Sequence, residues 1–300
     1  MTGDPLTGRA FTVACIQTNS TREPETNISA VSDLIRRARD LGGEFILVPE
    51  IVNMLEPKRD LLLAKARAEA DDPTLAAFRD LARETGAWLL AGSLALRAGE
   101  SPRALNDAPL PGRADDEAER CVNRSILIAP SGDVAARYDK IHMFDVDLGQ
   151  IEGVRERYHE SRTYRPGAKA VTADLPWGRL GMTICYDMRF PHLYRALAKK
   201  GAEFFSVPAA FTRPTGRAHW HVLLRARAIE NGAFVFAPAQ CGEHAEGRKT
   251  YGHSLIVDPW GEVLADGGEE VGVVTARIDP ARVAEARAKI PAIFSDRDFN

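Results

Sequence analysis

Three polar residues, Glu50, Lys140 and Cys185, could together carry out nucleophilic chemistry. Cys185 stands in the segment GMTICYDMRFP (181–191), where an apolar run leads into a polar turn and then into a predicted helix beginning near Pro191. A nucleophile on such a strand-to-helix turn is exposed at the carboxyl end of a sheet, where backbone N–H groups can meet an oxyanion. The helix N-terminus would also favour the thiolate. Taken alone, Cys185 is more typical of a small apolar strand residue.

Glu50 and Lys140 would supply a base and a cation for that thiol. Glu50 follows the apolar run FILVP at the end of a predicted buried strand, where a carboxylate is costly unless it has a partner or a task. We expect partial burial to raise its pKa and so make it a general base. Lys140 stands in RYDKIHMFD, where it could favour the thiolate and stabilise a tetrahedral intermediate. A loop-capping glutamate and a solvated lysine remain open when each residue is taken alone.

The elements that must position these residues alternate between strands and helices. Short apolar runs rich in β-branched residues predict strands, and apolar residues at helical spacing predict helices. The pattern predicts a layered α/β fold with a large core, with no domain linker and no internal repeat of clear period. The predicted strands are residues 11–18, 45–48, 88–96, 124–129, 134–139, 179–185, 203–207, 234–239, 252–258, 262–265 and 271–278, and the predicted helices are 27–41, 74–85, 190–200 and 219–231.

Three segments depart from this alternation of strands and helices. Residues 99–120 are rich in Pro, Asp, Glu and Ala, with almost no apolar periodicity, which predicts a surface insertion. Residues 148–158 (LGQIEGVRERY) are expected to form a second polar loop. The tail after Ile290 is short and mixed, and it is either frayed or held against another surface.

Composition excludes several classes of function. The formal net charge of -3 leaves no basic surplus for nucleic acid or an anionic membrane. The four cysteines are scattered without a CxxC pair, and the N-terminus lacks a signal-peptide pattern, so we expect a cytoplasmic protein with free thiols. We find no phosphate loop, nucleotide fingerprint or metal cluster, so neither a cofactor nor a metal is expected. His219 and His221 project from different sides of a helix, which argues against a joint metal site.

The three polar residues occur in blocks that together resemble the nitrilase, or carbon–nitrogen hydrolase, superfamily. LVPE (47–50), RYDKIHMFD (137–145) and GMTICYDMRFP (181–191) match the blocks of the family's Glu–Lys–Cys triad, in order. The resemblance covers nearly the whole chain, so we assign a hydrolase domain to residues 9–290 and a tail to 291–300. It implies a four-layer αββα sandwich with two mixed central sheets, and a homodimer or higher homo-oligomer in which such sandwiches stack.

The resemblance also implies a mechanism. Glu50 would take the thiol proton of Cys185, the thiolate would attack an amide carbonyl and release ammonia, and water would hydrolyse the thioester. Lys140 and the Tyr186 backbone N–H would hold the oxyanion. A second glutamate would position the lysine, and the block YHES places it at Glu160, with Glu156 as the alternative.

Later segments resemble the branch of the family that acts on deaminated glutathione, and AQCG (239–242) is the specific clue. Such a substrate carries carboxylates, which Arg189 or Arg213 could receive because guanidinium binds carboxylate bidentately. Phe211 and Thr212 are further candidates for substrate contacts. An ω-amidase acting on α-ketoglutaramate or α-ketosuccinamate remains open, as do a nitrilase, an N-carbamoyl amino acid hydrolase and a non-catalytic binding relative.

Overall fold

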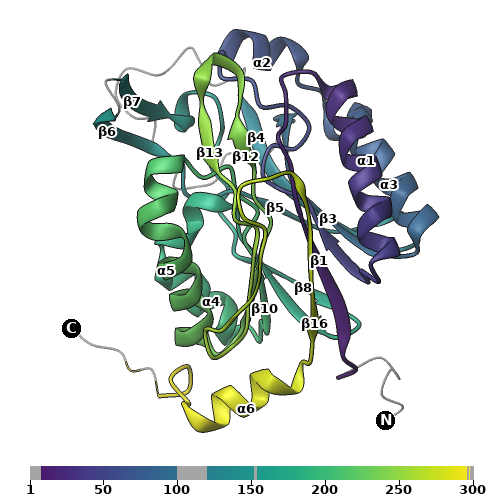
Figure 1. Ribbon diagram of the computed structural model, residues 1–300, viewed down its shortest axis with the longest axis vertical. Helices are drawn as coiled ribbons and strands as arrows, with labels where there is room; N and C mark the ends of the chain where they lie inside the picture. The colour runs from purple at the N-terminus through teal and green to yellow at the C-terminus, as the bar shows by residue number, and fades with distance from the viewer. Residues whose placement is uncertain (1–7, 100–119, 152–153, 296, 298–300) are drawn as a thin grey trace.

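The chain folds into two mixed six-stranded sheets that pack face to face, with helices on their outer sides (Figure 1). The computed structural model describes residues 8–99, 120–151, 154–295 and 297. The sheet orders are β16-β1-β2-β3-β4-β5 and β15-β14-β11-β10-β9-β8. In each sheet the three central strands run parallel and the outer pairings are antiparallel. The predicted αββα sandwich with two mixed sheets is therefore confirmed.

The strands are β1 (Phe11–Gln17), β2 (Phe45–Leu47), β3 (Trp88–Arg97), β4 (Cys121–Ile128), β5 (Val134–Asp139), β6 (Asp145–Ile151), β7 (Val154–His159), β8 (Val171–Leu175), β9 (Gly178–Met182), β10 (Phe204–Ser206), β11 (Phe234–Ala237), β12 (Cys241–Glu243), β13 (Lys249–Tyr251), β14 (Leu255–Val257), β15 (Val263–Asp266) and β16 (Gly272–Ile278). The helices are α1 (Pro24–Asp40), α2 (Arg59–Lys65), α3 (Pro73–Thr85), α4 (Pro191–Lys199), α5 (Arg213–Asn231) and α6 (Ala281–Lys289).

Side-chain alternation along β1 explains why this strand has an apolar residue at nearly every position. Val13 and Cys15 belong to the core between the sheets, whereas Ala14 and Ile16 belong to the core beneath α1 and α3. Successive strand residues point to opposite faces, so a strand buried on both faces reads as a continuous apolar run. On the other outer face, α4 and α5 cover the second sheet (Figure 1).

The two sheets are built from two copies of one pattern, although we expected no clear internal repeat. β1, β2, β3, β4 and β5, with α1 and α3, have the same topology as β9, β10, β11, β14 and β15, with α4 and α5. Matching residues occupy matching places: GGEFILVPE (42–50) corresponds to GAEFFSVPA (201–209), and SILIAPSGDVAA (125–136) corresponds to SLIVDPWGEVLA (254–265). The offset differs between blocks because the connecting helices and loops differ in length, which obscures the repeat in the sequence.

Several expectations about local structure need correction. Residues 148–151 and 154–158 lie in the paired strands β6 and β7 instead of in a loop. Helix α5 begins at Arg213, six residues before the predicted 219, because Pro214 fits the first turn of a helix. The strands β8, β12 and β13 and the helices α2 and α6 were not predicted. In the tail, Ile293 is buried in the main core.

The predicted insertion at 99–120 falls almost entirely outside the described residues. Among the helices of the described part of the chain, none combines the length and apolar character that crossing a bilayer requires.

Candidate active site

Cys185 lies just beyond the end of β9, where the strand turns into the short 3-10 helix Cys185–Arg189 and then into α4. Its φ of 46° is in the left-handed region, which is rare for a residue other than glycine and is typical of strained functional turns. Its backbone N–H donates to the carbonyl of Pro208 at 2.9 Å, which ties the turn to the neighbouring strand end. The predicted strand-to-helix turn is present, although the strand stops at Met182, before Cys185.

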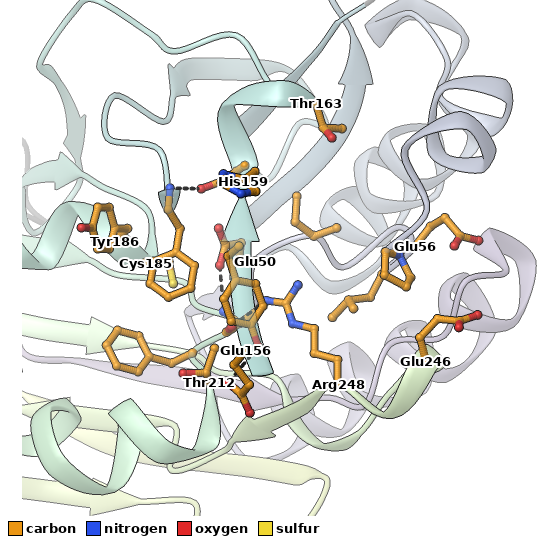
Figure 2. Close-up of a pocket in the computed structure, with 18 of the residues that line it drawn as sticks. Glu50, Glu56, Glu156, His159, Thr163, Cys185, Tyr186, Thr212, Glu246 and Arg248 are labelled. Carbon is orange, nitrogen blue, oxygen red and sulfur yellow. Dashed lines mark hydrogen bonds between the residues drawn. The ribbon is translucent and has the colours of Figure 1, made fainter. Parts of the chain in front are cut away.

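The thiol lines a cavity of about 570 Å³ at the carboxyl ends of the central strands of both sheets. That volume is within the range of roughly 300–1,000 Å³ that is usual for small-molecule sites. The cavity is also lined by the β6–β7 hairpin and by the segment between β12 and β13 (Figure 2). Of the four cysteines, all of them free, only Cys185 lines this cavity in the described structure.

Glu50 lies three residues beyond the end of β2, in the segment VPE that follows the strand. Its Oε1 accepts hydrogen bonds from Lys140 Nζ and Asn123 Nδ2, both at 2.9 Å, and its Oε2 accepts one from the backbone N–H of Ala210 at 2.8 Å. The next residue, Ile51, has a φ of 52°, and its N–H donates to Ser93. The carboxylate is thus buried yet held by three donors, which offset the cost of burying it.

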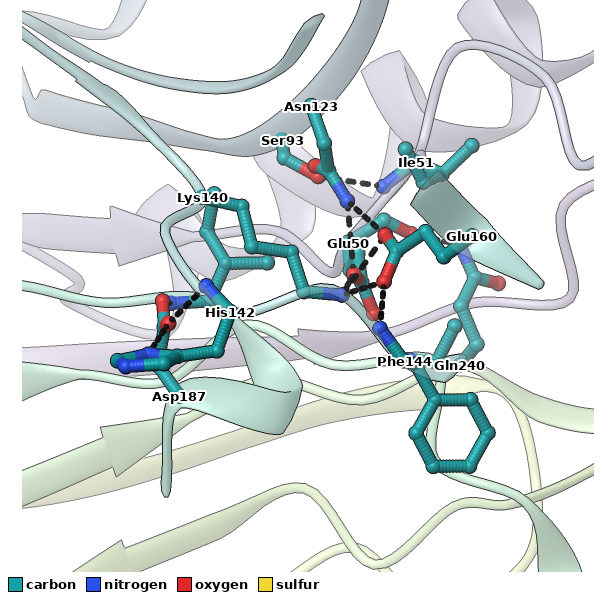
Figure 3. A network of polar contacts seen from close by, with 12 residues as sticks. Glu50, Ile51, Ser93, Asn123, Lys140, His142, Phe144, Glu160, Asp187 and Gln240 are labelled. Atoms are coloured by element: carbon teal, nitrogen blue, oxygen red, sulfur yellow. Dashed lines mark hydrogen bonds and ion pairs between the residues drawn. The ribbon is translucent and has the colours of Figure 1, made fainter. Parts of the chain in front are cut away.

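Lys140 follows β5 and lies between two carboxylates (Figure 3). Its Nζ lies 2.9 Å from Oε1 of Glu50 and 2.8 Å from Oε2 of Glu160. Glu160 also accepts hydrogen bonds from the backbone N–H of Phe144 at 2.7 Å and from Asn123 at 3.2 Å. Glu156, the alternative to Glu160, instead accepts from the phenol of Tyr158 at 3.2 Å. Glu160 is therefore the glutamate that holds the lysine in this structure.

The charges in this cluster set the protonation states. Burial alone would raise the pKa of Glu50, but the charge of Lys140 and the hydrogen bonds that Glu50 accepts hold it below its ordinary value. Burial would lower the pKa of Lys140, but Glu160 and Glu50 hold it well above its ordinary value. The expectation of a raised pKa for Glu50 is therefore wrong: the lysine charge and the accepted hydrogen bonds together outweigh desolvation, and Glu50 is ionised at neutral pH.

The thiol of Cys185 is neutral in the same environment. Burial raises its pKa, the charge of Glu50 raises it further, and the opposing charge of Lys140 does not restore it. The resting state therefore consists of a thiol, a carboxylate and an ammonium group. We expected the lysine and the helix terminus to favour a thiolate, but the free site favours the neutral thiol.

Asp187 connects the turn that carries Cys185 to the segment that carries Lys140. Its Oδ2 accepts hydrogen bonds from the backbone N–H of Ile184 at 2.9 Å and from the phenol of Tyr138 at 2.7 Å. Its Oδ1 accepts from the backbone N–H of His142 at 3.1 Å and lies 2.7 Å from the ring Nδ1 of the same residue (Figure 3). His142 therefore has a structural partner.

The residues predicted to contact substrate divide into two groups. Tyr186, Phe211 and Thr212 line the cavity. Arg189 and Arg213 are not among its lining residues. The Arg189 guanidinium lies 5.2 Å from the centre of the Phe211 ring, with Nη2 3.2 Å from Nδ1 of His219. The arginines that do line the cavity, Arg157 and Arg248, were not predicted.

Sequence reasoning missed three polar residues of the site. Asn123 interrupts the apolar strand β4, and a polar residue there is a signal that could have been used. Gln240 donates from Nε2 to the backbone carbonyl of Glu50 at 3.0 Å, and it lies in the AQCG segment that was noted for another reason. Arg248 stands in a polar stretch with no distinguishing pattern, so only the fold identifies it.

One group of side chains away from the cavity could hold a metal ion. His221 on α5, His253 and Asp266 place potential ligand atoms within 4.8 Å of one another. Asp266 already pairs with both imidazoles, at 3.0 Å and 2.8 Å, and these contacts account for the cluster. None of the three lines the cavity that contains Cys185.

Comparisons with known proteins agree with this geometry. The profile of the carbon-nitrogen hydrolase family matches residues 12–288. The deaminated glutathione amidase of Yersinia enterocolitica is 38% identical over 285 residues, which covers 95% of this chain and 92% of that protein. The crystal structure of the Caenorhabditis elegans NitFhit protein is similar at a TM-score of 0.83 and 36% identity; the match covers 97% of this chain and 66% of that one. Saccharomyces cerevisiae Nit3, described as a member of branch 10 of the nitrilase superfamily, is similar at a TM-score of 0.79 and 26% identity over 97% of both chains.

Proposed function

Because the chain belongs to the carbon–nitrogen hydrolase family and hydrolyses carbon–nitrogen bonds of amides, we propose that it cleaves deaminated glutathione through a thioester on Cys185. The observation that carries the mechanism is the buried cluster of Glu50, Lys140 and Glu160 beside a thiol in one cavity. The substrate is supported by relatives that match nearly the full chain and are named for this activity.

Acylation begins with the thiol in its neutral form. As the Cys185 sulfur attacks the amide carbon, its proton passes to the ionised carboxylate of Glu50 and a carbon–sulfur bond forms. Lys140 and the backbone N–H of Tyr186 stabilise the resulting oxyanion. The carbon–nitrogen bond then breaks, and the leaving nitrogen takes the proton from Glu50, which leaves a thioester and a free amine.

Deacylation repeats this sequence with water. Glu50 accepts a proton from the attacking water, a second tetrahedral intermediate forms, and the carbon–sulfur bond breaks. The departing sulfur recovers the proton from Glu50, which restores the thiol and releases a carboxylic acid. Glu160 does not touch the reacting atoms in this scheme; its two oxygens, at 2.9 and 2.8 Å from Nζ, position Lys140.

The nature of the amide decides which amine is released. A primary amide such as α-ketoglutaramate releases ammonia, as in the mechanism first expected. Deaminated glutathione is a secondary, peptide-like amide, so its hydrolysis releases an amine that keeps the rest of the peptide. This difference separates the proposed activity from that of an ω-amidase by product alone.

The experiment is a substrate panel with two readouts. Deaminated glutathione, α-ketoglutaramate, a simple nitrile and a carbamoyl amino acid are each incubated with the enzyme, and both ammonia and peptide amine are quantified. We expect deaminated glutathione to give the highest kcat/KM and a peptide amine as product. A higher kcat/KM for α-ketoglutaramate, with ammonia as product, would assign the ω-amidase activity instead. No turnover of any compound would favour a non-catalytic relative.

We also propose that the chain forms a homodimer through the outer face of α5. Val222 and Ile229 lie two turns apart on this helix and are 67% and 49% exposed, and the nearby Trp260 is 56% exposed. A patch of large apolar side chains on a monomer surface is typical of an interaction site. Light scattering should give the dimer mass for the wild type and the monomer mass for Val222→Asp. A monomeric wild type would contradict the proposal.

A cytoplasmic location is proposed on the basis of thiol chemistry. All four cysteines are free, and the mechanism requires Cys185 to remain reduced. Reducing compartments maintain such thiols. Fractionation of the source cells, followed by an activity assay, tests this; activity recovered outside the cytoplasmic fraction would contradict it.

A further inference from the structure

We propose that Arg248 binds a carboxylate of the substrate and thereby restricts the enzyme to amides that carry an anionic group. The inference rests on the proposed function for the reaction, but it assigns a task to a residue outside the catalytic cluster. Arg248 lies in the segment between β12 and β13 and lines the same cavity as Cys185.

Arg248 is held next to the reacting groups. Its Nη2 donates to the backbone carbonyl of Ala210 at 3.0 Å, and the N–H of the same Ala210 donates to Oε2 of Glu50 at 2.8 Å. The backbone of Ala210 is therefore hydrogen-bonded both to the guanidinium of Arg248 and to the carboxylate of Glu50, which serves as the base. Figure 2 shows the Arg248 side chain extending into the cavity toward the end that contains Glu50 and Cys185.

The guanidinium lacks the partners that such a group normally has. Its Nε is buried without a hydrogen-bond acceptor, and within the described ranges no carboxylate forms an ion pair with it. A buried donor left without a partner costs free energy, and a partly buried cation without an anion is rarer still. An anionic ligand in the cavity would supply the missing counter-charge.

Most of the other charged side chains that line the cavity are already paired; of the described lining residues, Glu156 contacts only the phenol of Tyr158 and Lys249 has no carboxylate partner. Glu50 and Glu160 contact Lys140, and Arg157 pairs with Asp147 at 3.0 Å. The remaining pairs are those of Glu246 with Arg22 at 3.1 Å and with Lys58 at 3.2 Å, and those of Glu56 with Arg22 and Lys65 at 3.7 Å.

Tyr158 forms the wall beneath the guanidinium. The Arg248 Cζ lies 5.7 Å from the centre of the Tyr158 ring, a cation–π distance. Burial raises the pKa of Tyr158 to about 12, so the phenol is neutral and supplies no anion at neutral pH. Tyr158 therefore does not neutralise the charge of Arg248, which remains available to a ligand. The planar guanidinium suits two parallel hydrogen bonds to a carboxylate.

The first test does not depend on the natural substrate. Cys185 is alkylated with N-iodoacetylglycine, which is anionic, and with its methyl ester, which is neutral and of similar length. Each rate is divided by the rate for free cysteine. We expect the wild type to favour the anion by about tenfold or more, and Arg248→Gln to lose this preference while keeping the rate for the ester. The matched control is Arg157→Gln, which removes a cavity arginine that is already paired and should keep the wild-type ratio.

The second test uses turnover. With deaminated glutathione, Arg248→Gln should lower kcat/KM by about ten- to hundredfold, mainly through KM, and Arg248→Lys should recover part of the loss. With a substrate whose carboxylates are esterified, wild type and variant should be equal. Equal losses on both substrates and both alkylating agents would overturn the role of Arg248. If the wild type instead fails to hydrolyse the substrate but keeps its preference for the anion, the proposed function fails and the carboxylate site stands.

Discussion

The two halves of the molecule share one topology but contribute different chemistry to the site. Where the first half has VPE, ending at Glu50, the second has VPA, ending at Ala209. Strand register aligns Val13 with Leu180, so the position of Cys185 corresponds to Thr18, which donates a hydrogen bond to Gln240. The fold thus creates two equivalent sets of strand ends, and the residues placed there decide which set carries the carboxylate and which the thiol.

The second half supports the first through its backbone. The segment that replaces VPE provides the N–H of Ala210 to Glu50 and the carbonyl of Pro208 to the N–H of Cys185. The equivalent strand ends therefore differ: the one in the first half supplies an ionised side chain, and the one in the second half supplies backbone N–H and carbonyl groups. The buried carboxylate at this strand end is thus surrounded by a cation and by N–H donors.

The largest effect is expected from removing the proposed nucleophile, which lies in the second half of the molecule. Cys185→Ala should lower kcat by about 10⁴-fold or more, because acyl transfer through the thioester becomes impossible. Cys15→Ala is the matched control, since it changes a buried cysteine in β1, the strand equivalent to β9. Initial rates on deaminated glutathione, with circular dichroism to check folding, measure both; retained turnover by Cys185→Ala would refute the mechanism.

A carboxylate placed at the equivalent position of the second half should damage folding without creating a site. Ala209 is buried, and Ala209→Glu would bury a further carboxylate, whereas the ammonium group of Lys140 is already paired with Glu50 and Glu160. We expect a loss of roughly 3–5 kcal/mol in the free energy of unfolding. Ala209→Ser is the control of smaller volume. Urea denaturation provides the measurement, and wild-type stability for Ala209→Glu would show that the strand end itself accepts a carboxylate.

The third prediction separates the two glutamates of the β6–β7 region. Glu160→Gln should lower kcat by about ten- to hundredfold, because Lys140 loses an ionic partner and its position, whereas Glu156→Gln should stay near the wild-type value. A purely structural role would not move the pH profile, so kcat is measured across pH. Equal effects of the two variants, or an unchanged profile for Glu160→Gln, would contradict a positioning role.

The smallest effect concerns pH and stability. The pKa of Glu50 is below its ordinary value of 4.5 in the folded state, so its contribution to stability is present above pH 4.5 and is lost as pH falls through the folded pKa. The pKa of Lys140 is above 10.5, so its contribution is present below pH 10.5 and is lost as pH rises further. Both contributions are therefore present together at neutral pH.

Glu50→Gln tests the acid side of this range. As the pH falls below 4.5, the free energy of unfolding of the variant should decrease less than that of the wild type, because the variant has no carboxylate at this position to protonate. Denaturant titrations at several pH values give the difference in free energy of unfolding. Parallel curves for the two proteins would mean that Glu50 has the same pKa folded and unfolded.

Much of the fold could be predicted because apolar strands and helices are local patterns. The runs around β1, β2 and β3 are buried on both faces, so their sequences are almost wholly apolar. The β6–β7 hairpin was missed because its strands, DVDLGQI and VRERYH, are largely polar. The internal repeat was missed because its blocks lie at unequal spacing.

The sequence could predict those site residues that come directly after a predicted strand. Glu50 and Cys185 each come directly after an apolar run, which marks them, and Lys140 follows a hairpin strand. Asn123 and Arg248 escaped because what they do depends on distant partners: Asn123 reaches Glu50 and Glu160, and Arg248 reaches Ala210. The lowered pKa of Glu50 is also a property of the assembled cluster, since burial alone predicts the opposite direction.

The most direct test of the proposed mechanism is the capture of the acyl-enzyme. The enzyme is mixed with deaminated glutathione, quenched in acid within the first turnover, digested and mapped by mass spectrometry. We predict a mass increase equal to the acyl part of the substrate, confined to the peptide that contains Cys185 and absent from Cys185→Ala. An acyl group on another residue, or turnover without any covalent species at Cys185, would contradict the mechanism.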